Sequence, residues 1–266
     1  MSYETAWGGD GIGVGVGGAM LAAQAVSKCF GSLAVLDNVS LPIKRGEAVG
    51  IVGPNGAGKT TLFNLISGFF PPSGGSILFD GKPITKVSPA SLVQQGIIRT
   101  FQITEIFLSL SVLENLRIAA EVAMGVSHRP WMTRALRTRI DERVQELMQV
   151  VGIGSKADRI AGELSHGDQR VVEIGIALSR SPKLLLLDEP TAGMGDEETQ
   201  NMTALIRRLN KEQGITTLFV EHDMEIVFGI ADRITVLDNG AMLAEGNAHE
   251  IANNPAVQAA YLGQAA

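Results

Sequence analysis

Residues 53–60, GPNGAGKT, combine glycines, a lysine and a threonine at the spacing of a phosphate-binding loop. Glycines allow backbone N–H groups to turn toward phosphate oxygens, and a helix beginning near Lys59 would direct its positive amino end to the same place. The Lys59 ammonium can reach the β- and γ-phosphates of a nucleotide, and the Thr60 hydroxyl can ligate Mg²⁺. The residues expected to surround the phosphates are Gly53, Pro54, Asn55, Gly56, Ala57, Gly58, Lys59, Thr60 and Thr61.

A second group of residues that could do chemistry is LLLLDEP at 184–190, an apolar run that ends in two acids. The four leucines predict a buried strand, which would hold Asp188 and Glu189 firmly at its carboxyl end. Asp188 suits an acidic group near Mg²⁺. Glu189 would point the other way on a strand and is placed to polarise a water molecule. Taken alone, the same residues would also fit a turn or a helix cap.

Another glycine pattern, G-x-G-x-x-G at Gly13, Gly15 and Gly18, is not interpreted as a dinucleotide site. No predicted strand precedes it, and its surroundings are so rich in glycine that the match carries little information. Residues 1–20 are expected to form a flexible glycine-rich tail. The uncharged run 11–27 is broken by glycines and follows acids instead of basic residues, so neither a signal peptide nor a membrane span is predicted there.

The elements that must position these groups follow from the periodicity of apolar residues. Strands alternate with helices, which predicts an α/β fold with a parallel sheet. Residues 90–180 are mostly helical by pattern, and we expect an inserted helical subdomain there. The predicted strands are 21–30, 33–43, 47–52, 76–80, 97–101, 184–188 and 215–221, followed by a hairpin at Asn239-Gly240. The predicted helices are 59–67, 111–125, 129–151, 167–180, 196–213 and 223–230, with a closing helix that includes Tyr261.

The composition of the 266-residue chain excludes several classes of protein. Apolar residues make up 45% and charged residues 19%, which is typical of a globular domain and not of a disordered chain. The net charge of −6 argues against nucleic acid as a partner, because phosphate backbones require a basic face. The single cysteine, Cys29, excludes a disulfide framework and a cysteine-based zinc site, and fits a reducing compartment.

Residues 164–169, LSHGDQ, begin the helix that precedes the acidic strand. Ser165 is a favourable N-cap, and the backbone of Gly167 can approach an anion closely. Taken alone, the segment fits an ordinary capped helix. Together with the phosphate loop and the acidic strand, it resembles the signature motif of ATP-binding-cassette (ABC) ATPases, whose usual core is LSGGQ. The resemblance runs from about Leu21 to the C-terminus.

Three further residues match motifs of this family in order and spacing. Phe30 matches the aromatic residue that stacks on adenine, Gln102 matches the glutamine of the Q-loop, and His222 in VEHDM matches the switch histidine. Taken singly, Phe30 would also fit core packing, Gln102 a surface amide, and His222 a capped strand end.

The resemblance implies a P-loop NTPase fold with a parallel core sheet, an antiparallel β subdomain and the helical subdomain, all within one nucleotide-binding domain over 21–266. It also implies ATP and Mg²⁺ as cofactors and a head-to-tail dimer of two such domains. The implied catalytic residues are Glu189, which would orient or deprotonate the attacking water, His222 at the γ-phosphate, Gln102 and Lys59. The implied Mg²⁺ ligands are Thr60, Gln102 and Asp188, and the residues that would cover the ATP of the other domain are Ser165, Gly167 and Asp168.

One departure from the family pattern follows Glu-Pro-Thr, where Ser-Ala-Leu-Asp is usual. Here residues 192–195 read AGMG, so Gly195 stands in place of the acid. The change is expected either to weaken communication between the two ATP sites or to reflect a partner ATPase with a different loop. Asp196 is placed to compensate in part.

Within the family, GDQ, VEHDM and the ending NNPAVQAAYLG resemble the ATPases of branched-chain amino-acid uptake systems. That resemblance implies two transmembrane permeases, a second and non-identical ABC ATPase, a substrate-binding protein, and a peripheral position on the cytoplasmic face of the inner membrane. Phe107, Leu108 and Leu110 would lie in the permease-docking groove, with core packing as the alternative.

The transported molecule stays open, because related systems carry urea, amides or aromatic acids. Three other functions are alternatives to amino-acid uptake. They are the ATPase of lipopolysaccharide-type export, a soluble ABC ATPase acting on DNA or ribosomes, and a small-molecule kinase built on the same phosphate loop.

Overall fold

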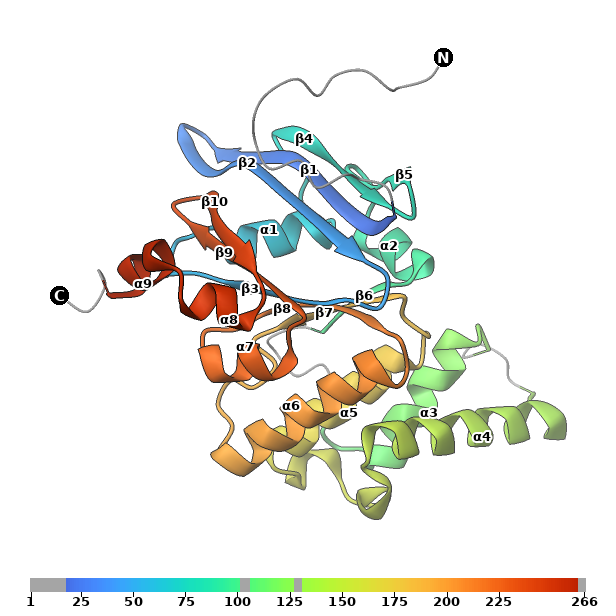
Figure 1. The fold of residues 1–266 in the computed structure, drawn as a ribbon. Coiled ribbons are helices and arrows are strands. Elements are labelled where there is room, and N and C mark those ends of the chain that lie inside the picture. The colour runs from blue at the N-terminus through green and yellow to red at the C-terminus, as the bar shows by residue number, and fades with distance from the viewer. Residues whose placement is uncertain (1–17, 101–105, 127–130, 263–266) are drawn as a thin grey trace.

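The structure is a computed structural model that describes residues 18–100, 106–126 and 131–262. Most of the tail predicted over 1–20 lies outside the described residues, and so does Gln102. The described chain forms two sheets and several helices, which are arranged in layers (Figure 1).

A six-stranded sheet forms the centre of the fold, in the order β10-β9-β3-β8-β7-β6. The strands from β9 to β6 are parallel to their neighbours, and β10 runs antiparallel to β9. The predicted parallel core sheet is therefore confirmed. Because these strands are parallel, the segments that follow β3, β7 and β8 emerge at the same edge of the sheet. The strands are β3 (Ala48–Val52), β6 (Ile97–Thr100), β7 (Leu184–Asp188), β8 (Thr216–Val220), β9 (Arg233–Asp238) and β10 (Ala241–Gly246).

A second, antiparallel sheet has the order β2-β1-β4-β5 and lies above the first in Figure 1. This is the antiparallel β subdomain that the family resemblance implies. Strands β1 and β2 are joined at the predicted Gly31-Ser32 turn, where Phe30 pairs with Leu33. Gly31 has a φ of 61°, which glycine adopts without a Cβ penalty. The strands are β1 (Ala19–Phe30), β2 (Leu33–Lys44), β4 (Gly74–Phe79) and β5 (Lys82–Pro83).

The helices occupy both sides of the six-stranded sheet. Helix α1 lies between the two sheets, and α3 to α6 lie below the six-stranded sheet (Figure 1). The helices are α1 (Lys59–Ile66), α2 (Pro89–Gln95), α3 (Val112–Ala123), α4 (Arg134–Val151), α5 (His166–Leu178), α6 (Asp196–Lys211), α7 (Met224–Ile230), α8 (Ala248–Ala252) and α9 (Pro255–Leu262), with short 3₁₀ turns η1 (Gly154–Lys156) and η2 (Ala161–Glu163).

The alternation of side chains along β7 divides the core into two parts. Leu184 and Leu186 pack with the antiparallel sheet and α1, whereas Leu185 and Leu187 pack with the helices below. All four side chains are fully buried. Burying a leucine stabilises a fold by about 1.5–3 kcal/mol, so the strand is fixed from both faces. This rigid strand ends at Asp188, as the apolar run predicts.

Helix α4 begins later than the sequence predicts. Its predicted start at residue 129 is wrong, because residues 131–133 are not helical and α4 begins at Arg134. The physical reason is the N-cap Thr133, whose hydroxyl accepts a hydrogen bond from the Leu136 amide at 3.3 Å. Among the described helices, none combines the length and apolar character needed to cross a bilayer.

Candidate active site

The phosphate loop connects β3 to α1 and leaves the amino end of α1 open. Gly58 is the N-cap residue, no side chain caps the helix, and no acid occupies its first turn. The first backbone N–H groups of α1 therefore lack a side-chain partner of the usual kind. Gly53 has a φ of 148°, and a Cβ there would come within 2.1 Å of the Leu237 carbonyl oxygen. The loop is thus a backbone cradle that suits an anion.

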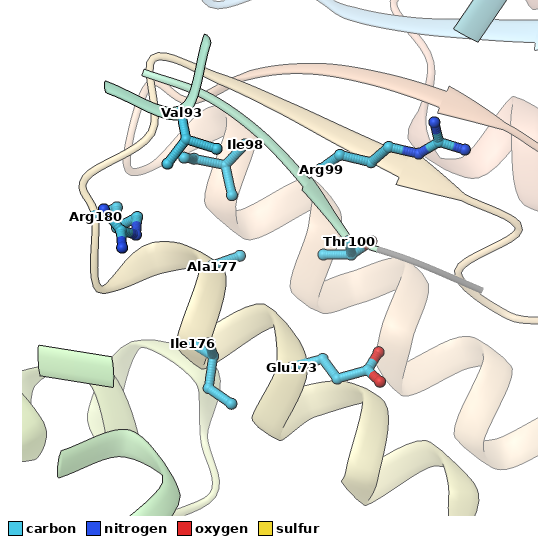
Figure 2. Close-up of a pocket in the computed structure, with 8 residues that line it drawn as sticks. All are labelled: Val93, Ile98, Arg99, Thr100, Glu173, Ile176, Ala177 and Arg180. Atoms are coloured by element: carbon cyan, nitrogen blue, oxygen red, sulfur yellow. The ribbon is translucent and has the colours of Figure 1, made fainter. Parts of the chain in front are cut away.

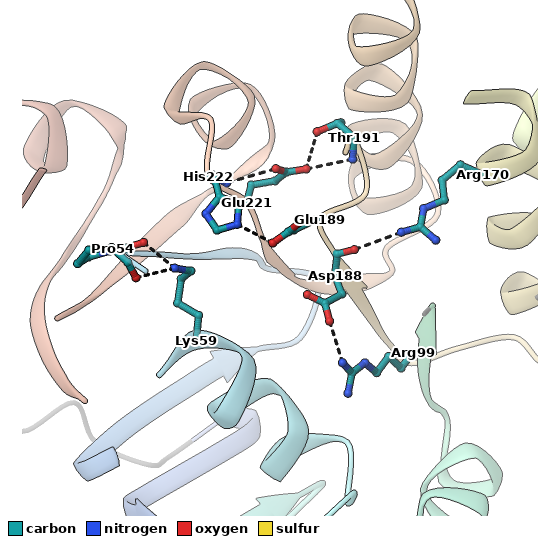
Figure 3. A network of polar contacts seen from close by, with 10 residues as sticks. Pro54, Lys59, Arg99, Arg170, Asp188, Glu189, Thr191, Glu221 and His222 are labelled. Atoms are coloured by element: carbon teal, nitrogen blue, oxygen red, sulfur yellow. Dashed lines mark hydrogen bonds and ion pairs between the residues drawn. The ribbon is translucent and has the colours of Figure 1, made fainter. Parts of the chain in front are cut away.

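Lys59 points back across this loop. Its Nζ donates hydrogen bonds to the carbonyl oxygens of Gly53 and Pro54, at 2.6 and 2.8 Å (Figure 3). Burial lowers the pKa of Lys59 below its ordinary value of 10.5, and nearby Glu189 opposes that shift. The Lys59 ammonium therefore lies at the loop with two neutral carbonyl groups as partners. No carboxylate among the described residues contacts it directly. A phosphate group would be a stronger partner.

Asp188 ends β7 and is almost fully buried, with 2% of its surface exposed. One carboxylate oxygen accepts a hydrogen bond from Arg99 of β6 at 2.8 Å. The other oxygen is directed to the side on which Lys59 lies (Figure 3). The backbone carbonyl of Asp188 accepts a hydrogen bond from Arg170 of α5 at 3.3 Å. The Asp188 carboxylate is therefore held by Arg99 on one side, and its other oxygen faces the side of the phosphate-loop lysine.

Glu189 and His222 lie together at the same edge of the sheet. His222 Nε2 and Glu189 Oε1 are 2.5 Å apart (Figure 3). Glu189 points away from Asp188, but strand alternation is not the cause, because β7 ends at Asp188. Glu189 instead has a φ of 45°, so a left-handed turn redirects its side chain. The sequence predicted both residues as functional, and the structure brings them into contact.

Glu221 is a buried acid to which no sequence motif assigned a role. Its Oε1 accepts hydrogen bonds from the Thr191 amide at 3.1 Å and from the Thr191 hydroxyl at 2.5 Å. Its Oε2 accepts one from the His222 amide at 3.3 Å. Glu221 thereby joins the segment after β7 to the segment after β8. The signal that could have found it is its place beside His222 in VEHDM.

Phe30 offers an exposed aromatic surface at the end of β1, with 47% of its surface accessible. Its ring meets Phe70 edge-on, with centroids 5.4 Å apart. The Lys28 ammonium lies 5.0 Å from the Phe30 centroid and 4.9 Å from that of Phe70. Cys29, between Lys28 and Phe30, is also exposed. An exposed ring backed by a second aromatic suits stacking on a planar base.

Ser165, Gly167 and Asp168 lie at the start of α5, and they make contacts within α5, with η1 and with α6. The Ser165 hydroxyl caps α5 by accepting a hydrogen bond from the Asp168 amide at 3.2 Å. The Asp168 side chain pairs with Lys156 of η1. A Cβ on Gly167 would come within 2.9 Å of Glu198 in α6. Gly167 therefore permits close packing of α5 on α6.

Oxygen ligands suitable for Mg²⁺ are present beside the loop. The Thr60 hydroxyl and the second carboxylate oxygen of Asp188 are hard donors of the type that Mg²⁺ prefers. Thr60 and Asn55 are exposed, and Thr61 is half-buried. Gln102 lies outside the described residues. The part of the predicted donor set that the structure describes therefore fits a magnesium ion.

Gly195, at the departure from the family pattern, is the N-cap of α6, with a φ of −75° and no side-chain cap. A Cβ at this position would meet nothing within 4 Å, so the absence of the usual acid has no steric cause. Asp196 follows as the first residue of α6.

An apolar region lies near the end of β6. Phe107 and Leu108 are exposed, at 54% and 53%, and so are not core residues. A cavity of about 160 Å³ lies between α2, β6 and α5 (Figure 2). The charged ends of Arg99 and Glu173, which contribute to its wall, are paired with Asp188 and Arg170. Arg180 also lines the cavity, but apolar groups make up most of its lining surface.

Comparison with protein families gives two matches. Residues 36–192 match the family model described as ABC transporter. Residues 241–266 match the model described as branched-chain amino acid ATP-binding cassette transporter. The first match covers more than half of the chain and includes the phosphate loop and the acidic strand.

Comparison with single proteins agrees with these matches. The chain is 38% identical over 252 residues to the high-affinity branched-chain amino acid transport ATP-binding protein LivG of Salmonella typhimurium, covering 92% of this chain and 98% of that protein. It resembles the crystal structure of an ATP-binding cassette of an ABC transporter in its ADP conformation, with a TM-score of 0.80 and 34% identity over 92% of this chain and 99% of the other.

A third relative is a dimeric ATP-binding cassette in a post-hydrolysis state bound to ADP and Pi. Its TM-score is 0.70, with 27% identity over 86% of this chain and 99% of that one. The family, the fold and the phosphate cradle thus agree with one another. The chain therefore belongs to the ABC transporter family, as an ATP-binding and ATP-hydrolysing subunit.

Proposed function

We propose that this chain is the ATPase subunit of an importer for branched-chain amino acids. The observation that carries the proposal is the match of residues 241–266 to the family model described for branched-chain amino acid transporters. Identity of 38% to a LivG protein, over nearly the whole of both chains, supports it. Urea, amides and aromatic acids are the alternative cargoes.

The proposed reaction is hydrolysis of ATP by water that Glu189 orients or deprotonates. Lys59 and the backbone N–H groups of residues 55–61 hold the phosphates, and His222 contacts the γ-phosphate. The Glu189–His222 contact of 2.5 Å supports a shared task, because each side chain fixes the direction of the other. Phe30 stacks on adenine. Thr60, Asp188 and Gln102 would hold Mg²⁺, which would supply positive charge to neutralise the phosphates.

The proposed working unit is a head-to-tail dimer with a second, non-identical ABC ATPase. Ser165, Gly167 and Asp168 lie together at the start of α5, and we infer that this end of the helix covers ATP on a partner. The glycine at position 195 supports an unequal pair, because the space around it would accept the usual acid. In this dimer the partner supplies the second side of each nucleotide site.

Two transmembrane permeases and a substrate-binding protein complete the proposed importer, which lies on the cytoplasmic face of the inner membrane. Exposed Phe107 and Leu108 support permease docking, and Leu110, which follows them in the sequence, is half-buried. We place the nucleotide-binding domain at 21–266, preceded by the tail. The helical subdomain lies within 90–180, although α2 and β6 in that range pack with the sheets.

An affinity purification of the tagged chain from detergent-solubilised membranes of its source tests the proposal. We expect two different multi-span permeases and a second cassette ATPase, and uptake of leucine, isoleucine or valine by vesicles reconstituted with them. Permeases accompanied by a periplasm-spanning bridge protein would replace import by lipid export. Recovery without any membrane protein would favour a soluble ATPase.

A further inference from the structure

Arg99 joins three parts of the site that are far apart in the sequence. Its guanidinium donates to Asp188 at 2.8 Å, to the Asn64 side-chain oxygen at 2.6 Å and to the Ser67 hydroxyl at 2.9 Å. Asn64 belongs to α1, which begins at the phosphate loop, and Ser67 is the C-cap of that helix. Arg99 itself belongs to β6, beside β7. One side chain thus connects the loop helix with the end of the acidic strand.

The guanidinium is also held by aromatic rings. Its central carbon lies 4.8 Å from the Phe63 centroid and 5.1 Å from the Phe69 centroid. Only 10% of the Arg99 side chain is exposed. The planar fork of an arginine bonds well in several directions at once, and stacking on rings limits its remaining motion. Arg99 is therefore a fixed donor and not a mobile counter-ion.

The position of Arg99 decides which way Asp188 faces. With one oxygen bonded to Arg99, the other is directed to the side of Lys59 (Figure 3). Without Arg99, the Asn64 side-chain oxygen loses this donor, and the Asn64 amide group can turn to donate to the buried carboxylate, whereas the Ser67 hydroxyl still donates to the Phe63 carbonyl. Asn64 lies on the α1 side, where Arg99 now stands, and would draw the carboxylate away from the loop.

We propose that Arg99 is a positioning residue, which orients Asp188 toward a divalent cation bound with the nucleotide at the proposed ATP site. The role rests on the proposed function but adds a residue to it. Arg99 touches neither the nucleotide nor the cation and acts through Asp188. The positive charges of Arg99 and of the cation would repel each other. The orienting effect of Arg99 outweighs this repulsion, because the Asp188 carboxylate lies between the two charges.

Binding of a fluorescent ATP analogue, measured in EDTA and across a Mg²⁺ titration, tests the role in the full chain. For Arg99→Gln we expect affinity in EDTA to stay within about twofold of the parent. The Mg²⁺ concentration for half-maximal enhancement should rise about tenfold, the effect of losing one charge-assisted hydrogen bond. Arg233→Gln is the matched control. Arg233 lies in β9, is partly buried, and forms an ion pair with Glu47. Its Mg²⁺ requirement should equal that of the parent.

Three further variants separate orientation from charge compensation and from simple loss of folding. Arg99→Lys keeps the charge but loses the fork, so it should restore the Mg²⁺ requirement only in part. Asn64→Ala and Ser67→Ala leave the buried ion pair intact and should raise the requirement about two- to fivefold, as expected for one neutral hydrogen bond. These two variants carry the test if Arg99→Gln does not fold.

A double-mutant cycle completes the test. Asp188→Asn should remove most Mg²⁺ enhancement, and adding Arg99→Gln to it should change nothing further. Two outcomes would overturn the positioning role but not the proposed function. One is that folded Arg99→Gln loses the same affinity for the ATP analogue with and without Mg²⁺. The other is that Arg99→Lys fully restores the parental Mg²⁺ requirement. Failure of the parent to bind the analogue at all would instead overturn the proposed function.

Discussion

Glu189 combines an unusual backbone with a short side-chain contact. A φ of 45° is uncommon outside glycine and costs about 1–3 kcal/mol, which the surrounding structure must offset. The Glu189 amide donates to the Val220 carbonyl at 3.0 Å, so the strained residue is fastened to β8. The strain turns the carboxylate away from Asp188 and toward His222. The two adjacent acids can then serve a cation and a water separately.

Replacement of Glu189 by glutamine should separate ATP binding from hydrolysis. Glu189→Gln keeps the size of the side chain but removes the base, so we expect near-parental ATP affinity and a loss of at least about a hundredfold in turnover. Size-exclusion chromatography with ATP and the partner ATPase should show an accumulated ATP-bound dimer. Glu142→Gln, at an exposed position of α4, is the control. Hydrolysis at the parental rate in Glu189→Gln would reject the assignment of the base.

Lys59 predicts a pH dependence of ATP affinity on the alkaline side. Burial lowers its pKa below 10.5, and ATP binds the protonated ammonium. Affinity should therefore fall as the pH rises through the lowered pKa, before an ordinary lysine would lose its proton. Titrations between about pH 8 and pH 10.5 measure this fall, since ATP itself no longer titrates there. Lys59→Met should bind more weakly and show a flat profile, and an equally steep profile would contradict the prediction.

At the scale of elements, two N-caps offer a comparison between stability and function. Thr133 caps α4 and Ser165 caps α5, each through one hydroxyl–amide hydrogen bond. Replacing either by alanine should reduce the free energy of unfolding by about 1 kcal/mol, measured by urea denaturation. Only Ser165→Ala should also slow ATP hydrolysis in the assembled transporter, because its cap is proposed to cover a partner's ATP. Similar hydrolysis by both variants would make Ser165 a structural residue alone.

At the scale of the whole molecule, α9, the last helix of the described residues, brings Tyr261 near the phosphate loop. Strand β10 pairs with β9, and Tyr261 of α9 packs against the main core with its hydroxyl enclosed. Burial raises the pKa of Tyr261 above 10.0, and the Gly53 amide in the phosphate loop opposes part of that rise. The C-terminal segment that matches the transporter-specific model thus reaches the nucleotide loop.

Tyr261 should add a pH dependence to the stability of the fold. Because the folded state holds the phenolic proton more tightly than the unfolded state does, its contribution is complete below pH 10.0 and is lost as the pH rises through the raised pKa. Tyr261→Phe should therefore lose less stability than the parent between about pH 9 and pH 11 in denaturant titrations. Tyr3→Phe, at the other tyrosine of the chain, is the control. The same alkaline loss in both variants would contradict this assignment.

Much of the fold follows from local patterns in the sequence. The leucine run at 184–188, the turn at Gly31-Ser32 and the hairpin at Asn239-Gly240 were all predictable, because each depends on neighbouring residues. The start of α4 was not, since the Thr133 cap lies beside residues with no helical signal. The pairing of Arg99 with Asp188 joins residues 89 positions apart, and no local pattern specifies it.

The phosphate-loop motif predicted Lys59 and its neighbours, the acidic strand together with that loop predicted Asp188 and Glu189, and the family resemblance added His222. The structure brings these residues to one edge of the sheet. The hydrogen bonds from Thr191 to Glu221 were not predicted. In the sequence, Glu221 looks like an ordinary polar residue at the end of a strand, and nothing in the local pattern indicates its partner. Gly167 was expected to approach an anion, and the structure adds a second constraint on it from Glu198 in α6. Packing of this kind depends on the whole fold.

The exposed thiol of Cys29 makes this chain suited to optical measurement. It is the single cysteine of the sequence, so a thiol-reactive dye would label one position without any engineered substitution. The dye would stand one residue from Phe30, where adenine is proposed to stack. Its emission should change when the aromatic surface is covered, which would turn nucleotide exchange in the native protein into a signal that can be followed in real time.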